Sequence, residues 1–183
     1  MSYPTHPVFI HSGGWDDETR QHPVMKWFEQ CTHEFDRTRA FANGTPSDWL
    51  APDFNVQLSD GTRIAGLQPA VQALIEKYAP FTDGHKHDPT ELLVWEEENH
   101  WCMLGHAKLF IGFKGTDKTI EDPQGEKWNV AIEATYRFAY VRDDTGSGSG
   151  FKVKEMKICA DPMPAVGFML KHEIVSAKDL GLS

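Results

Sequence analysis

The chain has 183 residues, 40% of them hydrophobic, and a formal net charge of −9. This length is ample for one hydrophobic core but short for two, so we expect one domain. The negative charge argues against a nucleic-acid-binding surface, because such surfaces neutralise phosphates with Lys and Arg. The N-terminus lacks a charged start followed by an apolar stretch, and nowhere do eighteen apolar residues run together, so we expect a cytoplasmic protein without membrane contact.

The first part of the chain predicts an arm and then a long helix. Residues 1–21 contain Pro, Gly, Asp and Ser without hydrophobic periodicity, which indicates an irregular N-terminal arm. From His22 to about Ala42, apolar residues recur at three- and four-residue spacings, which predicts an amphipathic helix with Pro23 in its first turn. The run NGTP at residues 43–46 ends this helix.

The next segment predicts two short strands and a second helix. A strand at Asp53–Leu58 meets an Asp60-Gly61 turn and a second extended piece at Arg63–Ala65. Residues 67–80 repeat apolar side chains on one helical face, with Pro69 in the first turn, and predict an amphipathic helix.

The remainder changes to the period of a β-sheet. Four strands are predicted, at Glu91–Glu97, Trp101–Phe113, Trp128–Val141 and Phe151–Ala160. Their connections are short enough for an antiparallel meander. We interpret residues 114–127 as a solvated hairpin end rather than a lid, and residues 143–150 (DDTGSGSG) as a hairpin loop rather than a linker. Residues 162–172 add a terminal turn or helix.

Alternation within the long strands predicts which side chains face the core. One face of residues 128–140 runs from Trp128 through Tyr136 to Tyr140 and is apolar, so it is the inner face, while Glu133 and Arg137 point outward. The same argument places the side chains of Trp101, Met103, Leu109 and Phe113 inside. It places those of Cys102, His106, Lys108 and Phe110 outside. Cys31, Cys102 and Cys159 are widely spaced and lack a CxxC partner, so we expect reduced core thiols.

The sequence GHKHD at residues 84–88 places two histidines one residue apart. On a strand, His85 and His87 would point into the same cavity, as a metal site or a proton shuttle requires. A metal site needs three or four ligands. The alternation predicts that His106 faces away, which leaves only the two histidines and Asp88, so we predict no metal site.

One stretch of the chain resembles a known superfamily. Residues 49–81 contain Ala51-Pro52-Asp53, Asp60-Gly61 and Gly66, followed by the second predicted helix. This stretch resembles the characteristic segment of the nuclear transport factor two superfamily, and the order of later elements agrees over residues 22–165. The resemblance implies an α+β, cystatin-like fold in which a cone-shaped, curved antiparallel sheet packs on helices. It implies one SnoaL-like α+β barrel domain at residues 22–175 and a C-terminal tail at residues 176–183.

Within this superfamily the chain looks closest to SnoaL-like polyketide cyclases and, more distantly, to scytalone dehydratase. Those relatives hold a small apolar pocket between sheet and helices, where a His or an Asp moves a proton without a cofactor. The strand histidine of the dehydratase falls near His87 or Asp88, its terminal-strand acid at Asp161, and a polar pocket residue near Tyr136. The resemblance therefore implies His87 as the acid or base, with His85 as its outer partner.

The resemblance also implies which side chains bind the substrate. The expected contacts are Trp27, Phe28, Cys31, Tyr78, Met103, Phe113, Ile132 and Phe138. The second pocket histidine of the dehydratase aligns with Phe113, which departs from that family's pattern and counts against dehydration itself.

Two functions from different classes follow from the sequence. The first is a cofactor-independent isomerase, cyclase or dehydratase that uses general acid–base catalysis on an apolar, carbonyl-bearing metabolite of polyketide or terpenoid type. The alternative is a non-catalytic binding or assembly module of the same fold. For either function we expect a homodimer through the outer face of the sheet, because Phe110 and Ala131 would add apolar surface there.

Overall fold

The computed structural model describes residues 7–98, 100–143, 150–178 and 181. Its helices are α1 (Pro23–Thr38), α2 (Leu67–Tyr78) and α3 (Met163–Lys171), with short 3-10 turns η1 (Thr19–Gln21) and η2 (Pro46–Asp48). Its strands are β1 (Val8–Ser12), β2 (Leu50–Gln57), β3 (Arg63–Ala65), β4 (His85–Glu97), β5 (His100–Ile111), β6 (Ile120–Glu121), β7 (Lys127–Trp128), β8 (Val130–Asp143) and β9 (Gly150–Ala160). None of the helices in these ranges has the length and apolar character needed to cross a bilayer.

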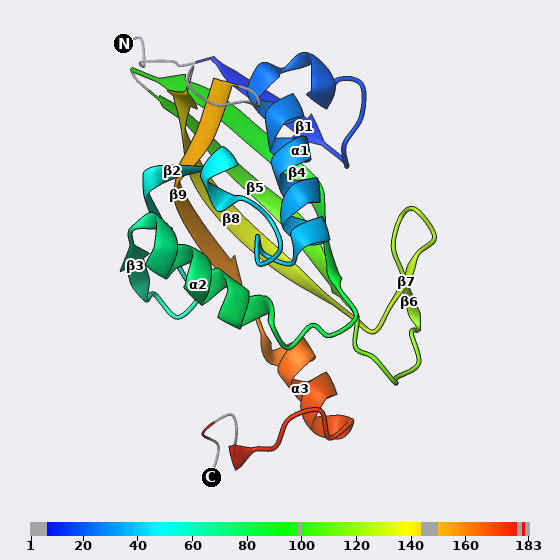
Figure 1. Cartoon of the computed structure of the whole chain (residues 1–183). Helices are drawn as coiled ribbons and strands as arrows, with labels where there is room; N and C mark the ends of the chain where they lie inside the picture. The colour runs from blue at the N-terminus through cyan, green and yellow to red at the C-terminus, as the bar shows by residue number, and fades with distance from the viewer. Residues whose placement is uncertain (1–6, 99, 144–149, 179–180, 182–183) are drawn as a thin grey trace, which may run out of the picture.

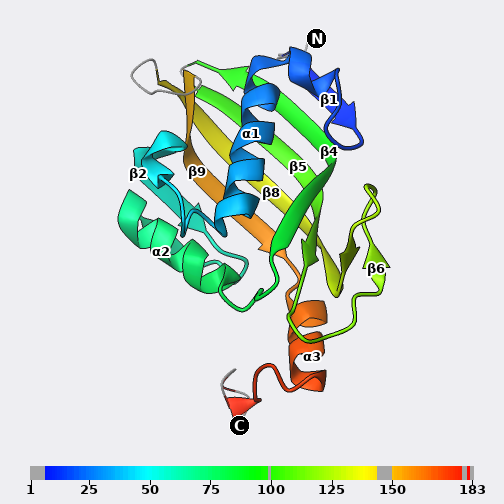
Figure 2. The same ribbon diagram turned by 45° about the vertical axis from the view of Figure 1, so that its right-hand side comes forward.

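Within the described residues, seven strands form one curved sheet in the order β1-β4-β5-β8-β9-β2-β3 (Figure 1). Neighbouring strands are antiparallel except β2 and β9, which are parallel. α1 lies across one face of this sheet, and α2 lies beside β2 and β3 (Figure 2). The predicted α+β fold and the antiparallel meander from β4 to β9 are confirmed. The parallel pairing of β2 with β9 was not predicted.

α1 follows the predicted apolar spacing but ends four residues earlier than expected. Pro23 occupies the first turn, where its missing N–H is not needed. After Thr38, the next three residues have positive φ angles, which reverses the chain. The reversal returns Phe41 to the core, where its ring lies 5.2 Å from that of Phe35. The burial of Phe41 therefore ends the helix at Thr38, although the apolar spacing in the sequence continues beyond this residue.

The N-terminal arm is not irregular throughout, because residues 8–12 form β1. This strand pairs antiparallel with β4, with Phe9 opposite Val94 and Ile10 opposite Leu93. Five residues with apolar side chains on both faces give no clear alternation, and the pairing partner lies about eighty residues further along the chain. The partner strand, rather than local sequence, makes this segment a strand.

β4 begins at His85, six residues before the predicted start. His85 pairs with Ile111 and His87 pairs with Leu109, so the GHKHD segment is part of the sheet. Pro89 had indicated a loop, since proline cannot donate a hydrogen bond within a strand. The register shifts between Pro89 and Glu91, and this bulge accommodates the proline.

The outer face of the sheet differs from the prediction at residues 110 and 128. Phe110 points outward as expected, but it is 3% exposed. The β6–β7 hairpin folds over it, and the ring of Trp128 lies 6.3 Å from the ring of Phe110. Trp128 therefore belongs to this outer cover rather than to the inner face, and Phe110 is not available to a second copy of the chain.

The cysteines also differ from the prediction in part. Cys31 and Cys102 are buried free thiols, whereas Cys159 is an exposed free thiol. Cys159 pairs with Thr135 on the outward-facing side of β9, so its position on that strand keeps it out of the core. Residues 144–149 of the predicted hairpin loop and part of the C-terminal tail lie outside the described residues.

Asp122 anchors the hairpin and gives a prediction for stability. Its carboxylate accepts hydrogen bonds from the Trp128 indole and the Lys86 ammonium. Burial alone would raise the pKa of Asp122, but these bonds and those from the Gln124 and Glu126 backbone N–H groups lower it to about 2. Because this pKa lies below the usual value, the stabilisation is present above about pH 4 and is lost as pH falls toward 2.

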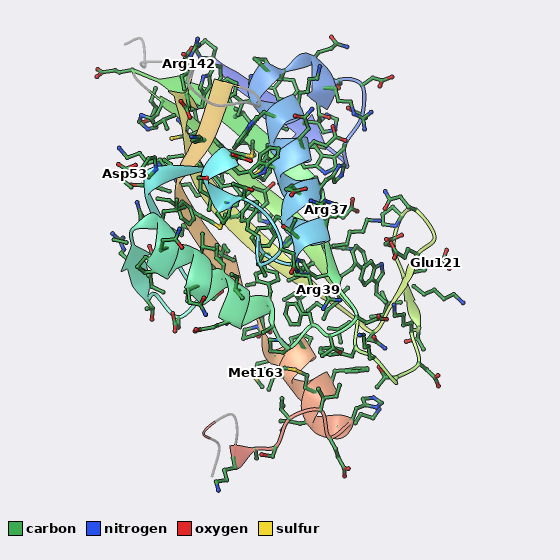
Figure 3. All side chains as sticks on the ribbon, in the orientation of Figure 1. Arg37, Arg39, Asp53, Glu121, Arg142 and Met163 are labelled. Atoms are coloured by element: carbon green, nitrogen blue, oxygen red, sulfur yellow. The ribbon has the colours of Figure 1, made fainter. Side chains whose placement is uncertain are left out.

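We expect Asp122→Asn to lower the free energy of unfolding by about 2 kcal/mol at neutral pH. The difference from the unmodified chain should shrink below about pH 4, where Asp122 begins to protonate. Chemical denaturation at several pH values measures both effects. Glu121→Gln is the matched control, since Glu121 is an exposed carboxylate on the same hairpin (Figure 3). Equal losses in the two variants would contradict the anchoring role.

Candidate active site

A cavity of about 350 Å³ lies between the inner face of the sheet and the three helices. Its walls are mostly apolar and include Phe28, Phe35, Leu109, Ile132, Phe138 and Met169. Side chains from α1, α2 and α3 all line the cavity. The last helix, α3, therefore closes part of it. A concave, apolar space with a few polar groups is typical of small-molecule sites.

The main polar group in the wall is His87, which is hydrogen-bonded at both ring nitrogens. Its Nδ1 lies 2.6 Å from Asp36 Oδ1, and its Nε2 lies 3.0 Å from the Tyr78 hydroxyl. The backbone N–H of His87 also donates to Asp36 Oδ2, at 2.9 Å. His87 and Tyr78 line the cavity, whereas Asp36 lies behind them. The three residues form a chain of hydrogen bonds that leads from α1 to the cavity.

These contacts fix the tautomer of His87. The Asp36 carboxylate can only accept, so the proton of a neutral imidazole lies on Nδ1 and Nε2 carries the lone pair. Nε2 then accepts from the Tyr78 hydroxyl. Burial, followed by the charge of Asp36, raises the pKa of Tyr78 above its usual value, so this phenol remains a donor. The arrangement gives His87 a proton acceptor on its cavity side.

Asp36 lies near the C-terminal end of α1, where its carboxylate needs hydrogen-bond donors. The C-terminal end of a helix carries a partial negative charge, which disfavours a carboxylate there. Two hydrogen bonds from His87 offset this unfavourable position. The same two bonds hold the His87 ring in place at the cavity wall.

His85 lies on the same side of β4 as His87, but it does not line the cavity. Its side chain is 1% exposed, and its Nε2 lies 3.5 Å from Asp36 Oδ1 without a hydrogen-bond partner among the described residues. Burial, the nearby His87 and the charge of Arg39 lower the pKa of His85 to about 2. His85 is therefore neutral, and it contacts Asp36 rather than the substrate space.

Tyr136 lines the cavity, as the inner-face alternation predicted. Its hydroxyl is buried and has no hydrogen-bond partner in the described part of the chain. The ring lies over Gly105, where an added Cβ would be 2.6 Å from the hydroxyl oxygen. Burial raises the pKa of Tyr136, so its hydroxyl can donate a hydrogen bond but does not ionise readily.

Asp161 does not reach the cavity, which corrects its expected catalytic role. β9 ends at Ala160, and the exposed Asp161 accepts a hydrogen bond from the backbone N–H of Met163 at 2.9 Å. Asp161 thus caps the first turn of α3. The resemblance placed an acid at the end of the strand correctly, but the helix that follows turns this carboxylate toward its own backbone.

The expected substrate contacts divide into two groups. Five of them line the cavity: Phe28, Cys31, Tyr78, Ile132 and Phe138. Trp27, Met103 and Phe113 are buried elsewhere. Trp27 packs between Trp49 and Tyr140, Met103 accepts from the Tyr140 hydroxyl, and Phe113 stacks on Phe168 of α3. The alternation of apolar residues along a strand identifies the side chains on the inner face of the sheet. It does not identify which of these side chains lie next to the cavity.

The sequence analysis missed Asp36. The sequence nevertheless indicates that Asp36 lies on the cavity side of the helix. Phe28, Thr32 and Asp36 follow one another at four-residue intervals along α1. Phe28 and Thr32 line the cavity, so the next position in this row lies near the same wall. Asp88, the carboxylate adjacent to His87 in sequence, does not line the cavity, since successive strand residues point to opposite faces.

Comparison with solved structures identifies the fold. Aln2 from a Streptomyces species matches with a TM-score of 0.58 and 14% identity, over 84% of this chain and 98% of that chain. A Streptomyces avermitilis protein, provisionally named a dehydratase of the NTF2-like family, matches with a TM-score of 0.58 and 12% identity, over 80% and 99%. Hexachlorocyclohexane dehydrochlorinase LinA-type3 from Novosphingobium barchaimii matches with a TM-score of 0.53 and 14% identity, over 80% and 91%.

The chain has the NTF2-like fold, which is also called cystatin-like. This agrees with the resemblance drawn from residues 49–81. No protein-family model matches the sequence, and no curated protein matches it. A shared fold does not determine function, which depends on the residues of the cavity.

The contact between Tyr136 and Gly105 gives a prediction. Gly105→Ala would place a Cβ 2.6 Å from the Tyr136 hydroxyl and 2.8 Å from the Glu91 carbonyl oxygen. Because the carbonyl is backbone, we expect this substitution to lower the free energy of unfolding by about 1–3 kcal/mol. Gly167→Ala is the control, since nothing lies near a Cβ there and alanine favours a helix. Thermal denaturation compares the two, and equal stabilities would contradict the placement of Tyr136.

Proposed function

We propose that this protein is a cofactor-independent enzyme that abstracts a proton from a small, apolar, carbonyl-bearing molecule. The observation that carries the proposal is the Asp36–His87–Tyr78 hydrogen-bond chain, which reaches the wall of an apolar cavity. A binding module would require the cavity alone. A carboxylate that orients the imidazole of a cavity-facing histidine is the arrangement that a general base requires.

In the proposed reaction, the bound substrate displaces the Tyr78 hydroxyl from His87 Nε2. The freed lone pair of Nε2 then takes a proton from a carbon next to the substrate carbonyl. Asp36 holds the imidazole in position and balances the positive charge that His87 gains. The electron pair of the broken C–H bond moves toward the carbonyl oxygen, and the buried, unpartnered Tyr136 hydroxyl turns toward this oxygen to donate a hydrogen bond. The apolar walls exclude water, so these interactions act in a medium of low dielectric constant.

The fate of the resulting enolate decides the type of reaction. Return of the proton to a different carbon gives an isomerase, and attack on a second carbonyl gives a cyclase. Expulsion of a group from the adjacent carbon gives an eliminating enzyme, or lyase. The dehydrochlorinase and provisional dehydratase among the structural matches have names that denote eliminations, which supports this third outcome. A polyketide- or terpenoid-like metabolite would suit the apolar walls.

Hydrogen–deuterium exchange tests the proposal without assuming a reaction type. The protein is incubated in D2O with a panel of ketones, enones and carbonyl compounds that carry a β-hydroxyl or β-halide group. Mass spectrometry detects deuterium uptake for proton transfer, or loss of water or acid for elimination. If compounds bind in the cavity but none exchanges or eliminates, the protein is a binding module and the proposal is wrong.

We expect His87→Gln to reduce turnover by roughly a hundredfold or more, because a positioned base is lost. Asp36→Asn should act in the same direction and lower kcat with little change in KM, since Asp36 lies behind the cavity. The double variant should be little worse than the worse single variant, because the two residues act as one unit. Asp161→Asn is the control and should retain activity. Full activity in both single variants would refute the assignment.

We also propose a homodimer through the outer face of the sheet, where apolar side chains are exposed. Ile10 is 61% exposed and Leu104 is 36% exposed. Both lie in register with Leu93, so they form an apolar row across β1, β4 and β5. Light scattering at tens of micromolar should show a dimer, and Leu104→Arg should shift it toward monomer. A monomeric unmodified chain under these conditions would contradict this proposal.

The cysteines support a reducing location for the protein. All three lie in the described ranges and are free thiols, and Cys159 is exposed to oxidation. We therefore propose the cytoplasm as its compartment.

A further inference from the structure

Three ligand atoms of the types that bind transition metals converge at the base of the cavity wall. They belong to Asp36, His85 and His87, and all lie within 4.8 Å of one another. Asp36 Oδ1 lies 2.6 Å from His87 Nδ1 and 3.5 Å from His85 Nε2. We propose that these residues bind a divalent ion of the zinc type, and that this ion inhibits the enzyme.

The donors match the chemistry of zinc. Two imidazole nitrogens and one carboxylate oxygen are a common set of protein ligands for Zn²⁺ and related ions, with a further position left for water. The sequence offered only two histidines and a carboxylate on the opposite face of the strand. Helix α1 supplies the third donor through Asp36, which the sequence analysis did not find.

The unpartnered Nε2 of His85 is an independent observation in favour of a ligand. A buried polar atom without a hydrogen bond is unfavourable, so such atoms usually have a partner. Here Asp36 Oδ1 lies 3.5 Å away but makes no hydrogen bond with this nitrogen. An ion between the two residues would satisfy the nitrogen.

Two other clusters of His, Cys, Asp and Glu are less suited to a metal. In the group of His11, Asp16 and Glu18, both carboxylates are more than half exposed, and His11 Nε2 already lies 3.1 Å from the Gly14 carbonyl oxygen. In the group of Glu97, His100 and Cys102, burial raises the pKa of the thiol to about 11. A protonated thiol is a poor ligand.

The inhibition follows from the shared atoms and rests on the function proposed above. An ion on His87 Nδ1 must replace the proton that this nitrogen shares with Asp36. The orienting hydrogen bond is then lost, and His87 becomes a metal ligand rather than a base. Arg39 follows the last residue of α1 (Figure 3), and its charge acts on His85 and opposes a cation there. We therefore expect reversible, micromolar binding rather than a permanent structural ion.

The test uses untagged full-length protein and the metals alone. Co²⁺ is titrated first, because bound Co²⁺ absorbs visible light and reports its ligands directly. We expect one equivalent to bind, and Zn²⁺ to displace it. Binding should be lost in His85→Ala, while His11→Gln and His100→Gln, which disrupt the other two clusters, should retain it. Circular dichroism checks folding, and Asp36→Asn serves as a second variant of similar shape if His85→Ala does not fold.

The outcomes separate this proposal from the proposed function. Absence of Co²⁺ and Zn²⁺ binding overturns the metal site, even if deuterium exchange occurs. Binding that survives His85→Ala but disappears in His100→Gln or His11→Gln also overturns it. With an active substrate, Zn²⁺ should reduce exchange at least tenfold when it saturates the site, and a chelator should restore it. Binding without this loss overturns the inhibition.

Discussion

The pair of hydrogen bonds between Asp36 and His87 is the contact on which the site depends. One carboxylate accepts from both the backbone N–H and the imidazole of His87, at 2.9 Å and 2.6 Å. These bonds join the last turns of α1 to the first residues of β4. They fix the rotamer of His87 and place Tyr78 on its other nitrogen. A change at either residue would therefore alter the cavity wall as well as the proton acceptor.

The cavity itself results from the curvature of the sheet. A single helix cannot cover a curved sheet of seven strands, so α2 and α3 complete the cover at one end (Figure 1). Aromatic side chains such as Phe28 and Phe138 pack edge to face, 5.3 Å apart, without filling the remaining space. The low dielectric constant of this space strengthens every charge interaction at its wall, which makes the carboxylate behind His87 effective.

Hydrophobic periodicity predicted those helices and strands whose formation does not depend on contacts with distant parts of the chain. α2, the meander of strands and the inward position of Tyr136 follow from local spacing, and the resemblance placed His87 at the pocket. Contacts across the chain were not predictable in this way. Asp36 joins the site from 51 residues before His87, and β1 becomes a strand only by pairing with β4. Asp161 has the residue type expected of the terminal acid, but α3 determines where its carboxylate points.

Packing alone does not explain why residue 85 is a histidine. Its ring packs among Phe35, Tyr78 and Phe81, with centroids 4.5–6.1 Å away. A phenyl ring would fill this aromatic setting without burying a polar nitrogen, so the imidazole carries a desolvation penalty that packing does not offset. The penalty would be relieved in any state where Nε2 gains a partner. Because Asp36 Oδ1 lies 3.5 Å from this nitrogen, such a state would also alter the carboxylate that holds the His87 ring, which links the environment of His85 to that of His87.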